Sequence, residues 1–151
     1  MIQYTASERM SIWAGIEVLA NDGRLRILDQ VLEELGRKYP EVLPRLASLD
    51  DYRAPRTTNA LRILFSQVIA ECPDLLDEDS PYEQADGWLV ASAVEYGYCV
   101  TTDELPSALR TSKRSKVHIP DACESLPGKI GCAKIRCRTL REIANDEGWL
   151  P

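Results

Sequence analysis

A length of 151 residues is enough for one compact domain, and 44% hydrophobic and 28% charged residues exclude a chain that is disordered throughout. The 24 acidic and 18 basic residues give a net charge of −6, which disfavours a protein that coats nucleic acid through its overall charge but leaves open a nuclease with an acidic, metal-binding cleft. No apolar run approaches the roughly 18–20 residues of a membrane span, the first residues lack the pattern of a signal peptide, and five cysteines, an odd number, indicate reduced thiols in a cytoplasm.

The first half of the chain predicts helices around one short strand. In chain order we expect a helix over residues 7–20, a strand over 24–28, a helix from 29 to 40 at the latest, a helical turn over 41–46, a loop over 50–56 and a helix over 58–72. Gly23 suits the left-handed cap that ends the first helix, and Asp29 suits the N-cap of the next.

The second half of the chain alternates helices and strands. We expect a helix over residues 80–96, a strand over 98–102, a loop over 104–116, a strand over 117–119, a short helix from 120, a strand over 132–135 and a helix over 138–145. Ser80 and Glu83 form a capping-box pattern at the start of the first of these helices, and Gly97 suits its C-cap. The order of elements favours a single α/β domain over residues 1–151.

Three carboxylates lie where α/β proteins usually carry their chemistry. Glu34 is on the helix after the first strand, Asp86 on the helix before the second strand, and Asp103 directly after that strand. Ligands of open α/β sheets bind at the carboxyl ends of the strands, and Asp103 has that position. Asp86 shares a predicted helical face with apolar residues, where a carboxylate has to be paired, hydrogen-bonded or bound to a cation.

Two interpretations of these acids stay open. Carboxylates that converge repel one another, and Mg²⁺ or Mn²⁺ relieves that repulsion and holds water that can attack a phosphodiester. In the other interpretation Asp86 is a cap or a surface residue, Glu34 a solvated helix residue and Asp103 a turn former.

Three segments of the chain resemble PIN-like domains, and the similarity spans about residues 8 to 145. The segment ADGWLVASAVEYGYCVTTDE, residues 85–104, has an aspartate on an apolar helix, then a strand, then Thr-Asp or Thr-Glu. The segments KVHIPDACESL, residues 116–126, and IWAGIEVLANDGRLRILDQVLEEL, residues 12–35, are similar to one PIN-like subfamily. This resemblance implies a three-layer α/β/α fold with a mainly parallel central sheet. It also implies a metal-dependent ribonuclease, with the toxin of a toxin–antitoxin pair as one candidate role.

The resemblance also implies site residues and partners. Glu34, Asp86 and Asp103 fall on acidic positions of the family, where they would be catalytic and hold Mg²⁺ or Mn²⁺. Asp121 is a candidate further ligand, and a helix N-cap after Pro120 is the alternative. RNA is the implied substrate, and an antitoxin, another protein or a second copy of the chain is the candidate protein partner.

The start of the chain departs from the PIN-like pattern. PIN-like proteins begin with a central strand that carries an aspartate, whereas this chain begins MIQYTASERM and has no aspartate before Asp22. The natural start lies upstream, or residues 1–5 form a degenerate strand, or the chain is an inactive member that binds a partner. We favour the first explanation and expect weak or absent activity from this chain. A catalytically inactive protein-interaction module is therefore the alternative function.

A small basic patch, TSKRSK, follows the second strand. Lys113, Arg114 and Lys116 are candidates for contacts with RNA phosphates, and a solvated loop is the alternative.

Two further groups of residues have a structural alternative. His118, Cys123, Cys132 and Cys137 are residue types that bind zinc, but they lack a Cys-x-x-Cys pair, and buried free thiols are the alternative. We expect Trp13 and Trp88, which have helical spacing, to belong to the core rather than to a platform for stacking bases.

Overall fold

The computed structural model describes residues 3–109 and 118–151. The chain divides into two compact units, which are described separately below. The first unit comprises Met1–Arg56 and Leu140–Pro151, and the second comprises Thr57–Thr139. In the described ranges, no helix combines the length and the apolar character that a bilayer span requires.

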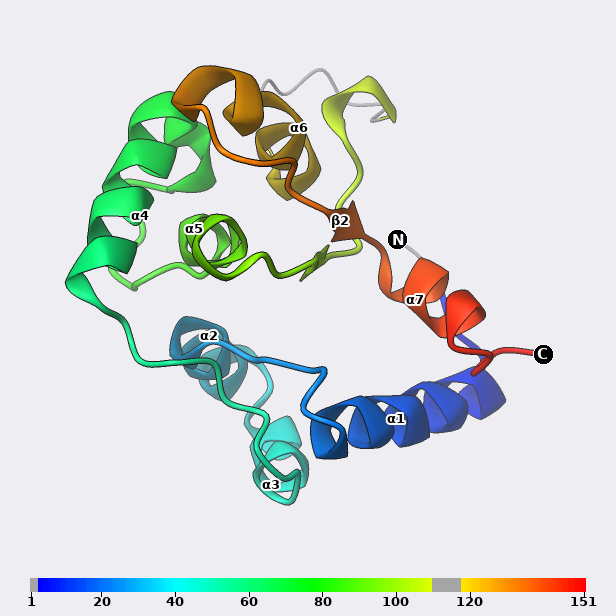
Figure 1. The fold of residues 1–151 in the computed structure, drawn as a ribbon. Coiled ribbons are helices and arrows are strands. Elements are labelled where there is room, and N and C mark those ends of the chain that lie inside the picture. Colours follow the sequence, from blue (N-terminus) through cyan, green and yellow to red (C-terminus); the bar gives the residue numbers. More distant parts are fainter. Residues whose placement is uncertain (1–2, 110–117) are drawn as a thin grey trace. The chain divides into compact units, whose positions relative to one another are not determined.

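The first unit is built from helices. Its elements are α1 (Ala6–Asn21), α2 (Asp29–Lys38), the 3-10 turn η1 (Pro40–Val42), α3 (Leu43–Ala47) and α7 (Leu140–Asp146) (Figure 1). A capping box starts α1, because the Glu8 N–H donates to Thr5 Oγ1 at 3.2 Å and the Thr5 N–H donates to Glu8 Oε2 at 2.7 Å. Gly15 allows the indole of Trp149 to lie against α1, since a Cβ at this position would come within 2.1 Å of the ring.

A small apolar core joins α1 to α3 and to the segment after it. Ala20, Leu46 and Leu49 are buried, and half-buried side chains such as Trp13 and Tyr52 pack against them. The predicted helices over residues 7–20 and 58–72 and the helical turn over 41–46 are confirmed to within one or two residues.

The strand predicted over residues 24–28 is wrong. Only Ile27 pairs there, in a parallel bridge with Arg53. The N–H groups of Arg24 and Leu25 instead donate to the Leu19 carbonyl at 2.8 and 3.1 Å, so the start of the predicted strand closes the end of α1. The helix that follows begins with Asp29 itself, after the N-cap residue Leu28, and not with Asp29 as the cap.

The second unit combines helices with two short strands. Its elements are α4 (Asn59–Glu71), the 3-10 turn η2 (Pro73–Leu75), α5 (Asp86–Tyr96), β1 (Val100–Thr101), the 3-10 turn η3 (Ser107–Leu109), α6 (Ile119–Ile130) and β2 (Cys137–Arg138). The strands β1 and β2 pair in parallel, with Val100 opposite Cys137. A parallel pair joined through α6, beside further helices, agrees with the α/β class.

The helices α4 and α5 pack side by side in the second unit (Figure 1). The rings of Phe65 and Trp88 stack between them, with centroids 4.0 Å apart and an interplanar angle of 15°. Gly87 permits this approach, because a Cβ there would lie 2.8 Å from Phe65 Cε2 and from Ile69 Cδ1. Trp88 is thus a core residue, as predicted.

Three predicted boundaries in this unit are wrong. The helix predicted from Ser80 begins only at Asp86, because the Ser80 hydroxyl accepts the N–H of Tyr82 at 3.3 Å in a local turn. Ile119, the last residue of the strand predicted over residues 117–119, is instead the first residue of α6. Residue 117 lies outside the described ranges. Residues 132–135, predicted as a strand, have no regular secondary structure and lead to β2.

Candidate functional site

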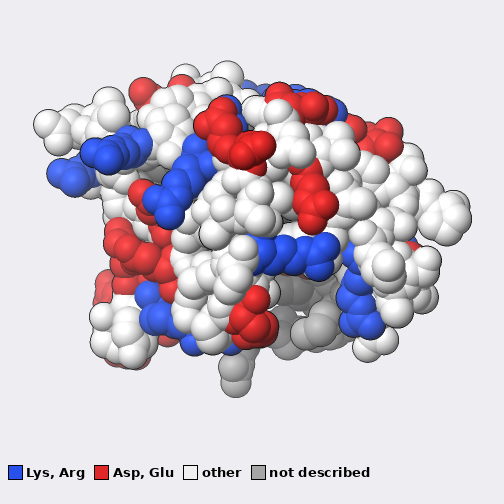
Figure 2. Space-filling view, turned by 90° about the horizontal axis from the view of Figure 1, so that it is seen from below, with Lys and Arg blue, Asp and Glu red and all other residues white. Residues whose placement is uncertain are grey.

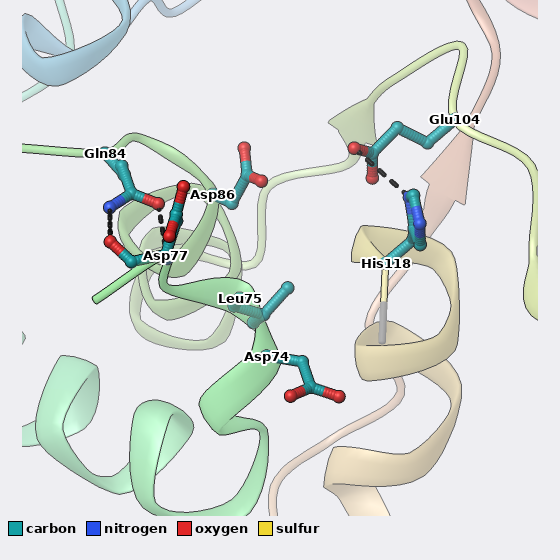
Figure 3. Close-up of a pocket in the computed structure, with 7 residues that line it drawn as sticks. All are labelled: Asp74, Leu75, Asp77, Gln84, Asp86, Glu104 and His118. Atoms are coloured by element: carbon teal, nitrogen blue, oxygen red, sulfur yellow. Dashed lines mark hydrogen bonds and ion pairs between the residues drawn. The ribbon is translucent and has the colours of Figure 1, made fainter. Parts of the chain in front are cut away.

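The second unit contains a cavity of about 160 Å³ that is lined mainly by acidic side chains. Four carboxylates, one amide, one imidazole and one leucine line it: Asp74, Asp77, Asp86, Glu104, Gln84, His118 and Leu75. Figure 3 shows the Glu104 carboxylate beside the His118 ring, with Asp86 across the cavity on the side of Gln84. Because the carboxylates outnumber the single imidazole, the cavity favours a cation over an anion.

One wall of the cavity is a loop that Gln84 holds in place. The Gln84 side chain accepts the Asp77 N–H at 2.7 Å and donates to the Asp77 carbonyl at 2.8 Å. These two bonds close the segment between η2 and α5, and they explain why the chain is not yet helical at Ser80. Asp74, Asp77 and Gln84 were not predicted as site residues, because nothing in the local sequence distinguishes them from ordinary loop residues.

Asp86 occupies the first position of α5 and is half-buried. The N-terminal end of a helix favours a negative charge, since the unpaired N–H groups and the helix dipole are positive there. The next turns of α5 bury Val90 and Ala93, as the predicted apolar face requires. The Asp86 side chain thus lies at the positive end of the helix dipole, at the edge of the apolar core.

Glu104 enters the cavity from the loop that follows β1, and this is the carboxyl end of a parallel strand. Its Oε2 accepts the N–H of Ile119 at 3.0 Å, and its Oε1 lies 3.4 Å from His118 Nδ1. The side chain thus caps α6 and orients the imidazole. Asp103, the residue predicted for this role, is exposed and does not line the cavity. The sequence indicates an acidic site residue directly after this strand, and Glu104 is the residue next to the predicted Asp103.

Asp121 serves the start of α6. Its Oδ2 accepts the N–H of His118 at 3.1 Å, and its Oδ1 accepts the N–H and the hydroxyl of Ser107 at 2.9 and 2.7 Å. This arrangement matches the capping alternative for Asp121, although the residue lies one turn inside the helix and not at its N-cap.

Glu34 belongs to the first unit, whereas the other predicted acidic residues belong to the second. It lies on α2, and its Oε1 is 3.5 Å from Lys38 Nζ, one helical turn further along. Such a pair is an ordinary feature of a helix surface. The predicted RNA-contacting residues Lys113, Arg114 and Lys116 lie outside the described ranges.

The residues considered for zinc lie in two places. His118 lines the cavity, whereas Cys123 and Cys137 contact each other through their thiols. None of the five cysteines, all of which lie in the described ranges, is in a disulfide. Over residues 3–109 and 118–151, no three or more His, Cys, Asp or Glu side chains form a group that could hold a metal ion by themselves. On the face drawn in Figure 2, basic side chains are interspersed with acidic ones.

Comparison with known proteins gives a family. The sequence model of a family described as a domain of unknown function (DUF4411) matches residues 2–143. No curated protein and no solved structure matches the chain. The matched range includes every residue that lines the cavity.

Proposed function

The chain belongs to the DUF4411 family, and we propose that it is a PIN-like nuclease that cleaves RNA with the help of Mg²⁺ or Mn²⁺. One observation carries the proposal: Asp86 and Glu104 line the same acidic cavity, one from the start of α5 and the other from the carboxyl end of β1. The resemblance of residues 85–104 and 116–126 to PIN-like sequences is what links this cavity to nuclease chemistry.

The proposal includes the three-layer α/β/α fold of PIN-like domains. The run from β1 through α6 to β2, with the two strands parallel, is the β–α–β connection that such folds repeat. This connection supports the finer fold assignment. It also places Glu104 at the strand edge where α/β proteins bind their ligands.

The donor chemistry of the cavity fits Mg²⁺ or Mn²⁺. In proteins Mg²⁺ keeps several waters and is held by one or two carboxylates together with substrate phosphates. Asp86 and Glu104 would supply the two carboxylates. A bound ion would reduce the repulsion between the acidic cavity and a phosphodiester, and would lower the pKa of coordinated water.

The other residues of the cavity would position these groups. Gln84 fixes the loop that carries Asp77, and Glu104 holds the His118 ring at a defined place. His118 is the only histidine of the chain, and the ring nitrogens of an imidazole can form hydrogen bonds with a phosphate. The substrate phosphate would thus contact the carboxylates through the bound cation. It would contact the His118 imidazole directly.

A melting experiment with Mn²⁺ tests the proposal. An ion that binds only the folded chain at about 100 times its Kd stabilises by about 2.7 kcal/mol, which raises Tm by about 5–10 °C. We expect this rise in the wild type and its loss in Asp86→Asn. We also expect weak Mn²⁺-dependent cleavage of single-stranded RNA by the wild type, and none by the variant.

A charge-matched control distinguishes Mn²⁺ binding in the cavity from a general effect of the negative charge of the protein. Glu124 is exposed on α6 and does not line the cavity, so Glu124→Gln removes one negative charge elsewhere in the same unit. This variant should keep the full rise in Tm. The proposal is wrong if wild type shows no rise, or if Asp86→Asn responds to Mn²⁺ as wild type does.

A protein-interaction module is the second candidate function, and the surface of α1 favours it. Met10 and Val18 are 76% and 54% exposed, and they lie eight residues apart with the exposed Ala14 midway. This spacing places the three on one face of the helix. If α1 mediates association, Met10→Gln with Val18→Gln should shift the sedimentation coefficient of the chain toward that of a monomer. An unchanged coefficient would remove self-association as the role of this face.

A further inference from the structure

Two cysteine side chains of the second unit meet where α6 packs on β2. Cys123 of α6 is only 3% exposed, whereas Cys137 of β2 is half-buried. Their thiols are hydrogen-bonded to each other, and neither cysteine is in a disulfide. Neither residue lines the acidic cavity, so the pair is a separate chemical feature of the unit.

The two thiols differ in their exposure to solvent and in their surroundings. The hydrogen bond with Cys137, together with burial, raises the pKa of the Cys123 thiol above its ordinary range, and the nearby Cys99 and Cys72 add to the effect. Cys123 therefore keeps its proton. Cys137 is the more accessible of the pair, so its thiol is the one that peroxide reaches first.

We propose that Cys123 and Cys137 are a peroxide-sensitive pair that oxidises to an intramolecular disulfide. The Cys137 thiolate attacks one oxygen of hydrogen peroxide and the O–O bond breaks. Cys137 becomes a sulfenic acid, and the released hydroxide takes up a proton to form water. The Cys123 sulfur then displaces the sulfenic hydroxyl, which leaves with the Cys123 proton as a second water. Two thiols are oxidised, and one peroxide is reduced to two waters.

The disulfide would join two elements that both lead to the acidic cavity. The helix α6 begins next to His118, and Cys123 lies in its second turn. The strand β2 pairs Cys137 with Val100 of β1, and Glu104 follows β1. The bond would therefore tie the element that carries His118 to the sheet that leads to Glu104, two groups that are now 3.4 Å apart. The inference is independent of the proposed nuclease activity.

Peptide mapping after oxidation tests the pair. The reduced chain is treated with hydrogen peroxide, its remaining thiols are blocked with iodoacetamide, and it is digested with trypsin. Cys123 then lies in the peptide of residues 117–129 and Cys137 in that of residues 137–138. We expect these two peptides to be linked, with loss of both thiol hydrogens, and to separate on treatment with dithiothreitol.

The single histidine provides a second readout. The NMR signals of the His118 imidazole should shift on oxidation and return on reduction, because α6 is then held differently against β2. Cys132→Ser removes a half-buried thiol outside the pair and should leave the linkage unchanged. Cys137→Ser should abolish it, and the wild-type peptide map decides if that variant does not fold.

Three results would overturn the proposal. Both cysteines could remain open to iodoacetamide after peroxide treatment, or Cys123 could link to Cys99 or Cys72 instead. The third is oxidation of Cys137 to a sulfinic acid with no link to Cys123.

Discussion

The Glu104 carboxylate accepts the backbone N–H of Ile119 at 3.0 Å, so a residue of the loop after β1 closes the first turn of α6. The other oxygen of the same carboxylate lies 3.4 Å from His118 Nδ1, and both residues line the acidic cavity. One side chain thus serves both helix stability and the candidate site. Capping needs only an acceptor oxygen, whereas cation binding needs negative charge, so substitutions can separate the two roles.

Glu104→Ala should lower the free energy of unfolding by about 1 kcal/mol, as the loss of a helix cap does. Glu104→Gln should cost much less, because its amide oxygen can still accept the Ile119 N–H. Both variants should lose the Mn²⁺-induced rise in Tm, since both remove the charge. Urea unfolding and melting with Mn²⁺ measure the two effects. Equal destabilisation by both variants would contradict the capping role, and a full Mn²⁺ response of Glu104→Gln would contradict the ion-binding role.

Gly87→Ala should destabilise the second unit by about 1–3 kcal/mol, the usual cost of overpacking. The added Cβ would lie 2.8 Å from atoms of Phe65 and Ile69, where α4 and α5 meet. Gly128 of α6 is the matched control, because a Cβ there has no neighbour within 4 Å and its φ is not positive. Gly128→Ala should stabilise by about 0.5–1 kcal/mol through better helix propensity. Urea unfolding of both variants should give opposite signs.

The existence of most helices and several of their C-terminal ends could be predicted from the sequence because local signals decide them. Gly23 and Gly97 both adopt φ of 69°, as predicted for residues at or just beyond the C-terminal ends of helices. The strand bounds could not be predicted in this way, because pairing depends on distant residues. The strand β2 includes Cys137, for example, because that residue pairs with Val100 of β1, which is distant in the sequence.

Part of the candidate site could likewise be predicted from local signals, whereas the rest depends on residues that are distant in the sequence. Asp86 could be recognised because a carboxylate on an apolar helical face calls for an explanation. The sequence could not decide between Asp103 and Glu104, since neighbouring residues in extended chain point in opposite directions. The choice depends on where α6 begins, because its first N–H binds Glu104. Nor could local pattern reveal that Gln84 closes a loop on Asp77.

Trp88→Ala and Trp13→Ala should differ in their cost. Trp88 is 7% exposed and stacks on Phe65, so its truncation should lower the free energy of unfolding by about 3–5 kcal/mol. Trp13 is half-buried, with the Arg45 guanidinium 4.3 Å from its ring centroid, and its truncation should cost about 2 kcal/mol because less apolar area is lost. Urea unfolding of the two variants measures the difference. A near-neutral Trp13→Ala would assign that ring to a binding surface.

Acid should destabilise the first unit through two carboxylates. The backbone N–H and the hydroxyl of Thr5, with a smaller contribution from Arg141, hold the pKa of Glu8 below its ordinary value of 4.5. Paired hydrogen bonds from Arg24 lower the pKa of Glu147 in the same way. A lowered pKa in the folded state means that the stabilisation is fully present above the unfolded pKa and is lost as pH falls through the folded one.

Glu147→Gln should therefore be less stable than wild type at about pH 6, and the difference in the free energy of unfolding should narrow toward about pH 3, as the wild-type carboxyl takes up its proton. Urea unfolding at the two pH values measures this convergence, with Glu124→Gln as the charge-matched control. Raising the salt concentration should shrink the difference at the higher pH, because the Arg24–Glu147 pair lies near the surface and is open to screening. A difference that persists unchanged at the lower pH would show that Glu147 stabilises the fold through packing and not through its charge.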